Sequence, residues 1–162
     1  MKEKITKIGM AEVSAAKHPA VLITLGLGSC VGICLYDKAK KVVGMAHIML
    51  PSSREIKNNN NKAKFADTAV ELLLEDMLGL GAQRHRITAK IAGGAQMFSF
   101  SSANELMKIG ERNVQAVKSE LVRLSIPVIA EDVGGNYGRT IEFYSENGDL
   151  GIKTIGHGIH VI

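Results

Sequence analysis

Cys30 and His47, in the N-terminal third of the chain, are the two residues whose types and spacing first suggest chemistry. Cys30 directly precedes the apolar, β-branched stretch 31–36, and His47 belongs to the stretch 42–50. The charged segment Asp37 to Lys40 between the two stretches predicts a hairpin. If that loop is symmetric, Tyr36 faces Lys41, and the antiparallel register continued from there pairs Cys30 directly with His47. Directly paired residues have Cβ atoms about 4.5 to 5.5 Å apart on one face of the sheet, close enough for a thiol and an imidazole to meet.

A thiol beside an imidazole is an arrangement for acyl transfer. The imidazole takes the thiol proton, the resulting thiolate attacks a carbonyl carbon, and the imidazolium then acts as general acid for the leaving group. Gly28 and Ser29 directly before Cys30 are the expected substrate-binding positions, because a glycine lets the backbone approach a substrate closely. The N–H groups near Ser29 and Cys30 are candidate donors to an oxyanion. The alternative is that Cys30 is a small buried hydrophobic residue and His47 an ordinary strand residue, and the residues alone leave both interpretations open.

Other patterns that could carry chemistry are weaker. Gly26 and Gly28 begin a dinucleotide-binding fingerprint, but Val31 stands where its third glycine is required. No histidine pair has the helical spacing of a zinc site and two cysteines cannot supply four ligands, so we expect no metal and no cofactor. The second cysteine, Cys34, is expected to be a packing residue, and we expect four histidines to be ordinary surface or loop residues: His18, His85, His157 and His160.

Composition limits the class of protein. With 162 residues, 46% of them hydrophobic and 22% charged, the chain is expected to fold as one domain, residues 1–162, rather than to be disordered. A net charge of +4 is too small and too dispersed to indicate a nucleic-acid partner, although it permits an acidic one. Neither a signal peptide nor an apolar run of membrane-spanning length is recognisable. Two cysteines are too few for the disulfide framework of a small secreted protein, which favours a reducing compartment. We therefore expect a cytoplasmic protein without direct membrane insertion.

The elements that must position Cys30 and His47 are short strands and two long helices. Apolar or β-branched runs predict strands at residues 5–13, 20–25, 31–36, 42–50, 87–92, 127–132, 140–144 and 150–155. Helical periodicity predicts one helix over residues 62–78 and a second that starts at the capping box of Ser102 and Glu105 and runs to Leu124. Residues 52–61, which end in four asparagines, have the composition of an exposed loop without regular structure. The expected class is α/β or α+β, a layered sandwich of mixed sheets with the helices packed outside.

Several blocks of the chain resemble one family over nearly its whole length. They are "GLGSC" at 26–30, "AHIMLP" at 46–51, "FADTAV" at 65–70, "KIAGGAQMF" at 90–98, "NVQAV" at 113–117 and "AEDVGGNYGRT" at 130–140. Together these blocks resemble CheD, the chemoreceptor glutamine deamidases of bacterial and archaeal chemotaxis.

The resemblance implies a function and a site. Cys30 corresponds to the family's nucleophile, His47 to its histidine, and Thr24 to a third catalytic residue that orients the imidazole. The implied reaction converts glutamines to glutamates on the cytoplasmic helices of methyl-accepting chemotaxis receptors, with methyl-ester hydrolysis as a related reaction. Phe98 and Phe100 are candidates for apolar contact with the receptor or a partner, or alternatively core residues. The implied alternative function is that of a non-catalytic adaptor that binds a CheC-type phosphatase and stimulates it.

Overall fold

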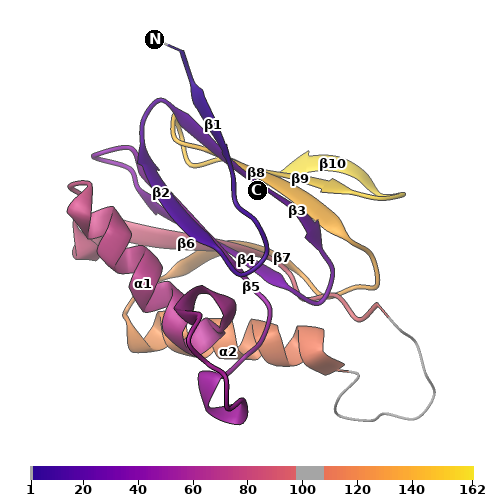
Figure 1. The fold of residues 1–162 in the computed structure, drawn as a ribbon. Coiled ribbons are helices and arrows are strands. Elements are labelled where there is room, and N and C mark those ends of the chain that lie inside the picture. The colour runs from indigo at the N-terminus through magenta and orange to yellow at the C-terminus, as the bar shows by residue number, and fades with distance from the viewer. Residues whose placement is uncertain (1, 98–107) are drawn as a thin grey trace.

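The computed structural model describes residues 2–97 and 108–162, which form two five-stranded sheets and two α-helices (Figure 1). The first sheet has the order β1-β3-β8-β9-β10, with strands Lys4–Lys7, Ala20–Leu27, Arg139–Tyr144, Leu150–Thr154 and Gly158–Val161. The second has the order β2-β5-β4-β6-β7, with strands Val13–Lys17, Val42–Ile48, Val31–Asp37, Ile87–Gly93 and Val128–Val133. Each sheet combines parallel and antiparallel pairs, so the predicted mixed α/β class is confirmed.

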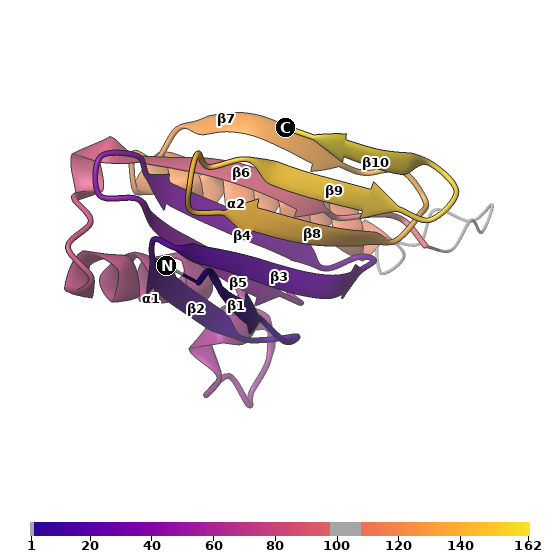
Figure 2. The same ribbon diagram turned by 90° about the horizontal axis from the view of Figure 1, so that it is seen from above.

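The chain is arranged in three layers. The first sheet stacks on the second, and α1 (Ala66–Gly79) and α2 (Ile109–Arg123) cover the other face of the second sheet (Figures 1 and 2). Strands β4 and β5 lie in the middle layer and are therefore buried at every residue. The predicted sandwich with its helices outside is confirmed.

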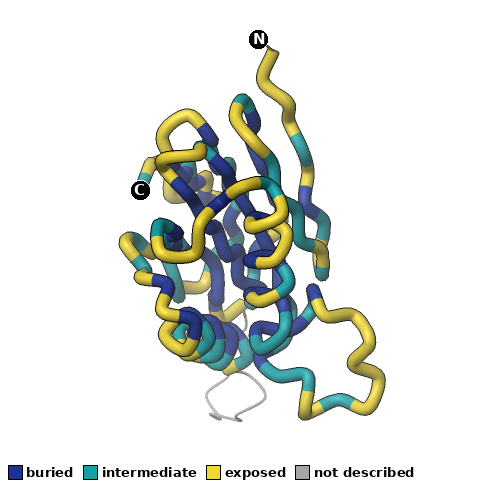
Figure 3. Tube along the Cα trace, turned by 90° about the vertical axis from the view of Figure 1, so that its left-hand side faces the viewer, coloured by how far each residue is buried: buried dark blue, intermediate teal, exposed yellow. Residues whose placement is uncertain are grey.

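Two hydrophobic cores follow from this layering, and Figure 3 shows the buried backbone in the interior of the molecule. Side chains of β5 alternate between the cores, because successive strand residues point to opposite faces. Ala46 and Ile48 pack toward the helices, while Val43 and Met45 pack between the sheets. By the same alternation, His47 points between the two sheets.

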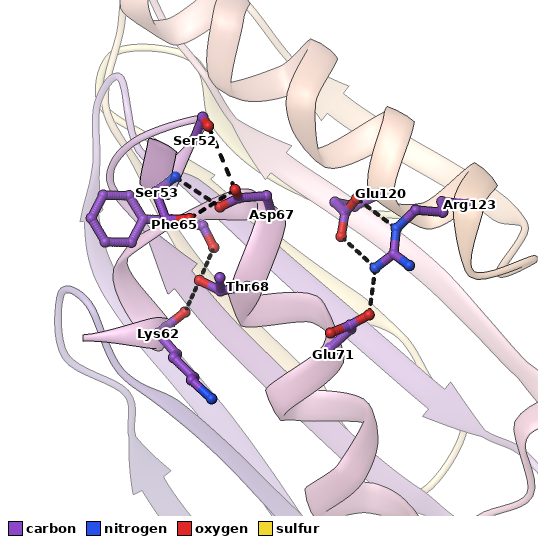
Figure 4. Close-up of polar contacts among 9 residues, drawn as sticks. All are labelled: Ser52, Ser53, Lys62, Phe65, Asp67, Thr68, Glu71, Glu120 and Arg123. Atoms are coloured by element: carbon purple, nitrogen blue, oxygen red, sulfur yellow. Dashed lines mark hydrogen bonds and ion pairs between the residues drawn. The ribbon is translucent and has the colours of Figure 1, made fainter. Parts of the chain in front are cut away.

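The segment that leads from β5 to α1 contains more structure than its composition predicts. A 3₁₀ turn spans Ser53–Glu55, and Ser53 donates to the carboxylate of Asp67 in the first turn of α1 from both its backbone N–H and its hydroxyl, each at 2.9 Å (Figure 4). The Thr68 hydroxyl donates to the Lys62 carbonyl at 2.6 Å. The expectation of an entirely irregular loop over residues 52–61 was therefore wrong at Ser53–Glu55.

The two helices are joined at their surface. Arg123 of α2 forms ion pairs with Glu120 of its own helix and with Glu71 of α1 (Figure 4).

The predicted helix over residues 62–78 starts later, at Ala66, after a separate 3₁₀ turn over Lys62–Lys64. The predicted capping box of the second helix, Ser102 and Glu105, lies outside the described residues. Neither described helix has the length and apolar composition needed to span a bilayer.

Candidate active site

His47 lies in the interior, between the two sheets. Strand β5 carries it in the middle layer, and 1% of its surface is exposed. Its neighbour on the antiparallel strand β4 is Gly32. A Cβ at position 32 would come within 2.6 Å of the Ile141 side chain in the first sheet, so glycine lets the two sheets approach each other closely at this position.

Thr24 of the first sheet meets His47 of the second across this space. The Thr24 hydroxyl lies 2.7 Å from His47 Nδ1, and it donates to the Ile8 carbonyl at 2.6 Å. A carbonyl only accepts, so the single hydroxyl proton of Thr24 is used by Ile8. The hydroxyl oxygen must therefore accept from Nδ1, which places the imidazole proton on Nδ1.

The other ring nitrogen of His47 is the basic one. With the proton on Nδ1, neutral imidazole carries its lone pair on Nε2. Nε2 is buried and has no hydrogen-bond partner within residues 2–97 and 108–162. The Thr24–His47 pair thus presents an unoccupied base in the interior of the protein.

Cys30 is placed differently from the prediction. Strand β4 extends through Asp37, so the turn is Lys38 to Lys41, where Lys41 has a φ of 53°, and the register pairs His47 with Gly32 instead of Cys30. The predicted direct pairing of Cys30 with His47 was therefore wrong by two residues. Because the error is two residues and not one, position 30 stays on the His47 face: Cys30 directly precedes β4 and packs in the core between the sheets. Across the described residues, no hydrogen bond joins the thiol to His47.

The loop that carries Cys30 is held by its carbonyl groups. Ala95 N–H donates to the Gly28 carbonyl and Gly94 N–H to the Cys30 carbonyl, both at 2.8 Å. The side chain of Asn113 in α2 donates to the Ser29 carbonyl at 2.9 Å. Within the described chain, the N–H groups of Ser29 and Cys30 donate to no other residue.

Gly93 is required where β6 passes this loop. Its φ is 113°, a conformation that favours glycine, and a Cβ there would lie 2.3 Å from the Cys30 carbonyl oxygen. The close approach of β6 to the loop therefore depends on the missing side chain at position 93.

Burial sets the ionisation of both candidate groups. Desolvation raises the pKa of the Cys30 thiol, and a hydrogen bond from the backbone N–H of Cys30 acts in the opposite direction. Desolvation lowers the pKa of His47. Both directions favour a neutral thiol and a neutral imidazole at rest, rather than the thiolate and imidazolium pair of the sequence-based hypothesis.

The remaining predicted residues fall into three groups. Gly28 and Ser29 are half-buried, and the side chain of Met97 lies over Gly28, where an added Cβ would come within 3.2 Å of it. Phe98 and Phe100 lie outside the described residues. The four histidines expected at surfaces or in loops are exposed, and the expected packing role of Cys34 is confirmed by its complete burial between the sheets.

Neither a metal-binding cluster nor one of the cavities described below coincides with the candidate site in the described part of the chain. The described ranges hold no group of three or more histidine, cysteine, aspartate or glutamate side chains placed to bind a metal ion. Five cavities in that part of the chain measure 240 to 380 Å³, and none of these five is lined by Cys30, His47 or Thr24.

Sequence reasoning missed three groups that build this site: the carbonyl of Ile8, Gly93 and the side chain of Asn113. Gly93 and Asn113 lie inside blocks that the family resemblance had marked, although neither had been given a function. A backbone carbonyl carries no side-chain signal, so Ile8 could not have been found from the sequence.

Comparison with known proteins gives consistent results. The family model described as CheD chemotactic sensory transduction matches residues 49–154. A probable chemoreceptor glutamine deamidase CheD of Caldanaerobacter subterraneus subsp. tengcongensis is 58% identical over 162 residues, which is 100% of both chains. The chemoreceptor glutamine deamidase CheD of Halalkalibacterium halodurans is 56% identical over 155 residues, 95% of this chain and 96% of that one.

Among solved structures, the hypothetical protein YfiH of Bacillus licheniformis matches with a TM-score of 0.45 and 16% identity, covering 74% of this chain and 49% of that one. This structural similarity and sequence identity are too low to bear on function. The family model and the full-length relatives, by contrast, agree with each other and with the blocks found in the sequence. This chain belongs to the CheD family.

Proposed function

We propose that this protein is a chemoreceptor glutamine deamidase in which Cys30 is the nucleophile, His47 the general acid and base, and Thr24 the residue that orients His47. The hydrogen bond between Thr24 Oγ1 and His47 Nδ1 at 2.7 Å carries the proposal, because it leaves the lone pair of the buried Nε2 available for a thiol proton. The names of full-length relatives support glutamine on a chemoreceptor as the substrate.

The first half-reaction forms a thioester. Nε2 takes the proton of the Cys30 thiol as the sulfur attacks the carboxamide carbon, and the carbonyl oxygen becomes an oxyanion. The N–H groups of Ser29 and Cys30, which donate to no other described residue, are the proposed donors to that oxyanion. The C–N bond then breaks, the imidazolium gives its proton to the departing ammonia, and the acyl group stays on Cys30.

The second half-reaction releases glutamate. His47 Nε2 takes a proton from water as the water oxygen attacks the thioester carbon, the C–S bond breaks, and that proton returns to the sulfur. A methyl ester at the same position would reach the same thioester with loss of methanol. Ester hydrolysis is therefore a second reaction proposed for this site.

The proposed substrate is the cytoplasmic helical bundle of a methyl-accepting receptor, which puts the proposed site of action in the cytoplasm. A second proposed partner is a CheC-type phosphatase, which the family resemblance implies. The adaptor function predicts that Cys30→Ala still binds and stimulates such a phosphatase. If the native protein does not bind a CheC-type phosphatase, the proposal of this second partner is wrong.

Deamidation of a receptor fragment tests the enzyme proposal. The native protein is incubated with a receptor cytoplasmic fragment, released ammonia is measured, and converted glutamines are mapped by mass spectrometry. Native protein should convert glutamines and Cys30→Ala should not. Cys34→Ala is the matched control, since it also removes a buried thiol from the core between the sheets and should stay active. No conversion by the native protein would overturn the proposal.

A further inference from the structure

Asn113 of α2 is a fully buried polar side chain that reaches both segments of the proposed site. Its Nδ2 donates to the Ser29 carbonyl at 2.9 Å and to the Met49 carbonyl at 3.0 Å. Because both partners are carbonyl groups that only accept, the orientation of the amide is fixed with Nδ2 toward them.

The two carbonyls belong to the two halves of the site. Ser29 directly precedes Cys30, and Met49 follows His47 by two residues, just past the end of β5. One amide group from the helix layer therefore joins the loop of the nucleophile to the strand of the base.

The hydrogen bond from Asn113 to the Ser29 carbonyl also fixes the direction in which the Cys30 N–H points. The Ser29–Cys30 peptide is trans, so the Ser29 carbonyl and the Cys30 N–H point in opposite directions from one rigid plane. With the carbonyl held toward α2, the N–H points away from the helix, and it lies within hydrogen-bonding reach of the Cys30 sulfur. A hydrogen bond to the carbonyl also polarises the peptide and makes its N–H a stronger donor.

Asn113 is poorly explained as a packing residue. Its Oδ1 is buried without a partner within the described part of the chain, and an unsatisfied buried acceptor destabilises a fold. An apolar side chain of similar size would avoid that loss. What an apolar side chain cannot supply is the pair of donors to Ser29 and Met49.

We propose that Asn113 is a positioning residue of this site: its amide sets the plane of the Ser29–Cys30 peptide, and with it the oxyanion donor, and holds the nucleophile loop against the end of the His47 strand. The inference rests on the proposed deamidase function for its kinetic consequence. Its geometric consequence, the position of the Cys30 N–H against the sulfur, does not depend on any substrate.

The test compares Asn113→Leu and Asn113→Ala with the native protein. Val117→Ala is the matched control, since Val117 is fully buried one turn further along α2 and its apolar side chain can donate no hydrogen bond to the Ser29 or Met49 carbonyl. For each protein, kcat and KM are measured on a receptor fragment, the alkylation rate of Cys30 is measured against pH without substrate, and folding is followed by thermal unfolding.

Both Asn113 variants should lose about 10- to 100-fold in kcat at unchanged KM, as expected for a misplaced catalytic group. Their alkylation profile should move to higher pH, because the thiolate loses its hydrogen bond from the Cys30 N–H. Val117→Ala should show neither effect. In Asn113→Ala, water has room to hydrogen-bond to the Ser29 and Met49 carbonyls, which reduces the loss of stability. This variant therefore provides the test if Asn113→Leu does not fold.

Two outcomes overturn the inference: folded Asn113 variants with native kcat and a native alkylation profile, or equal losses in Val117→Ala. If the native protein deamidates nothing, the proposed function fails by itself. The alkylation profiles then still decide whether Asn113 positions the Cys30 peptide.

Discussion

His47 donates a hydrogen bond from Nδ1 to the hydroxyl of Thr24, and that hydroxyl donates its own proton to the Ile8 carbonyl. The chain of donors fixes the imidazole tautomer without any carboxylate. It also ties a base on the second sheet to a strand of the first, so the site spans both sheets.

Replacing Thr24 with valine should disable this chain while keeping the side-chain shape. Without the hydroxyl, Nδ1 loses its acceptor, and the imidazole is free to rotate or to carry its proton on Nε2. We expect Thr24→Val to lower kcat by about 100-fold, within the range that general acid–base catalysis contributes. Thr24→Ser keeps the hydroxyl and should retain most activity, and a serine variant as inactive as the valine variant would contradict this account.

The pH dependence of Cys30 alkylation distinguishes a neutral pair from an ion pair. Burial raises the pKa of Cys30 and lowers that of His47, so the thiol should react with iodoacetamide only above the ordinary thiol range. In the proposed mechanism, deamidation needs a neutral His47. Its rate should therefore fall on acidification, with a midpoint below the ordinary histidine pKa.

His47→Gln is the control for this profile. In a neutral pair the substitution should abolish deamidation and leave the alkylation midpoint nearly in place. Rapid alkylation of the native protein at neutral pH that disappears in His47→Gln would show a resting ion pair and contradict the neutral site.

Two glycine variants separate backbone strain from contact with the nucleophile loop. Gly93 and Gly134 both have positive φ, 113° and 84°, but only an added Cβ at 93 meets the Cys30 carbonyl, whereas one at 134 meets nothing within 4 Å. Each alanine variant should lose about 1 to 2 kcal/mol of stability from strain. Gly93→Ala alone should also lose activity, by about 100-fold, through displacement of Cys30. Equal activity of the two variants in the deamidation assay would show that the contact at position 93 is unimportant.

Asp37 should make stability depend on pH in acid. Burial alone would raise the pKa of this carboxyl, but hydrogen bonds from Arg86 and from the backbone N–H groups of Gln83 and Lys40 outweigh it and lower the pKa from 3.8 to about 2. A lowered folded-state pKa stabilises the fold above the unfolded-state pKa, and that stability is lost as the pH falls from about 4 to about 2.

Asp37→Asn should therefore reduce the free energy of unfolding at neutral pH by about 1.5 to 3 kcal/mol, the range for hydrogen bonds to a charged group. Urea unfolding at several pH values measures this. The difference between native and variant should shrink toward pH 2, and a difference independent of pH would argue against the ionised carboxylate as its source.

Most strands could be predicted from the sequence, but β2 and β10 at the edges of the sheets could not. Strands β4 and β5 are continuous apolar runs because both of their faces are buried. Strand β10 is exposed at every residue, so its pattern carries no burial signal. Strand β2 consists largely of small residues that do not stand out as strand formers, and the predicted run over residues 5–13 crosses the turn between β1 and β2.

Part of the candidate site could be proposed from the sequence. Cys30 and His47 followed from residue type and strand order, but their register did not, because Asp37 is held as the last residue of β4 by Arg86 rather than belonging to the loop. Thr24 was found only through the family resemblance, since its two partners lie 16 and 23 residues away in the chain. Asn113 acts through carbonyls 84 and 64 residues away, and no local pattern encodes such contacts.

The most direct test of the central claim, that Cys30 forms a thioester with the substrate glutamine, is interception of that thioester. Native protein is incubated with a receptor fragment and hydroxylamine, and the modified positions are identified by peptide mass spectrometry beside Cys30→Ala and Cys34→Ala. We predict glutamyl hydroxamate at the positions that otherwise become glutamate, formed by the native protein and Cys34→Ala but not by Cys30→Ala. Glutamate formation without any hydroxamate, or hydroxamate formation by Cys30→Ala, would contradict the account.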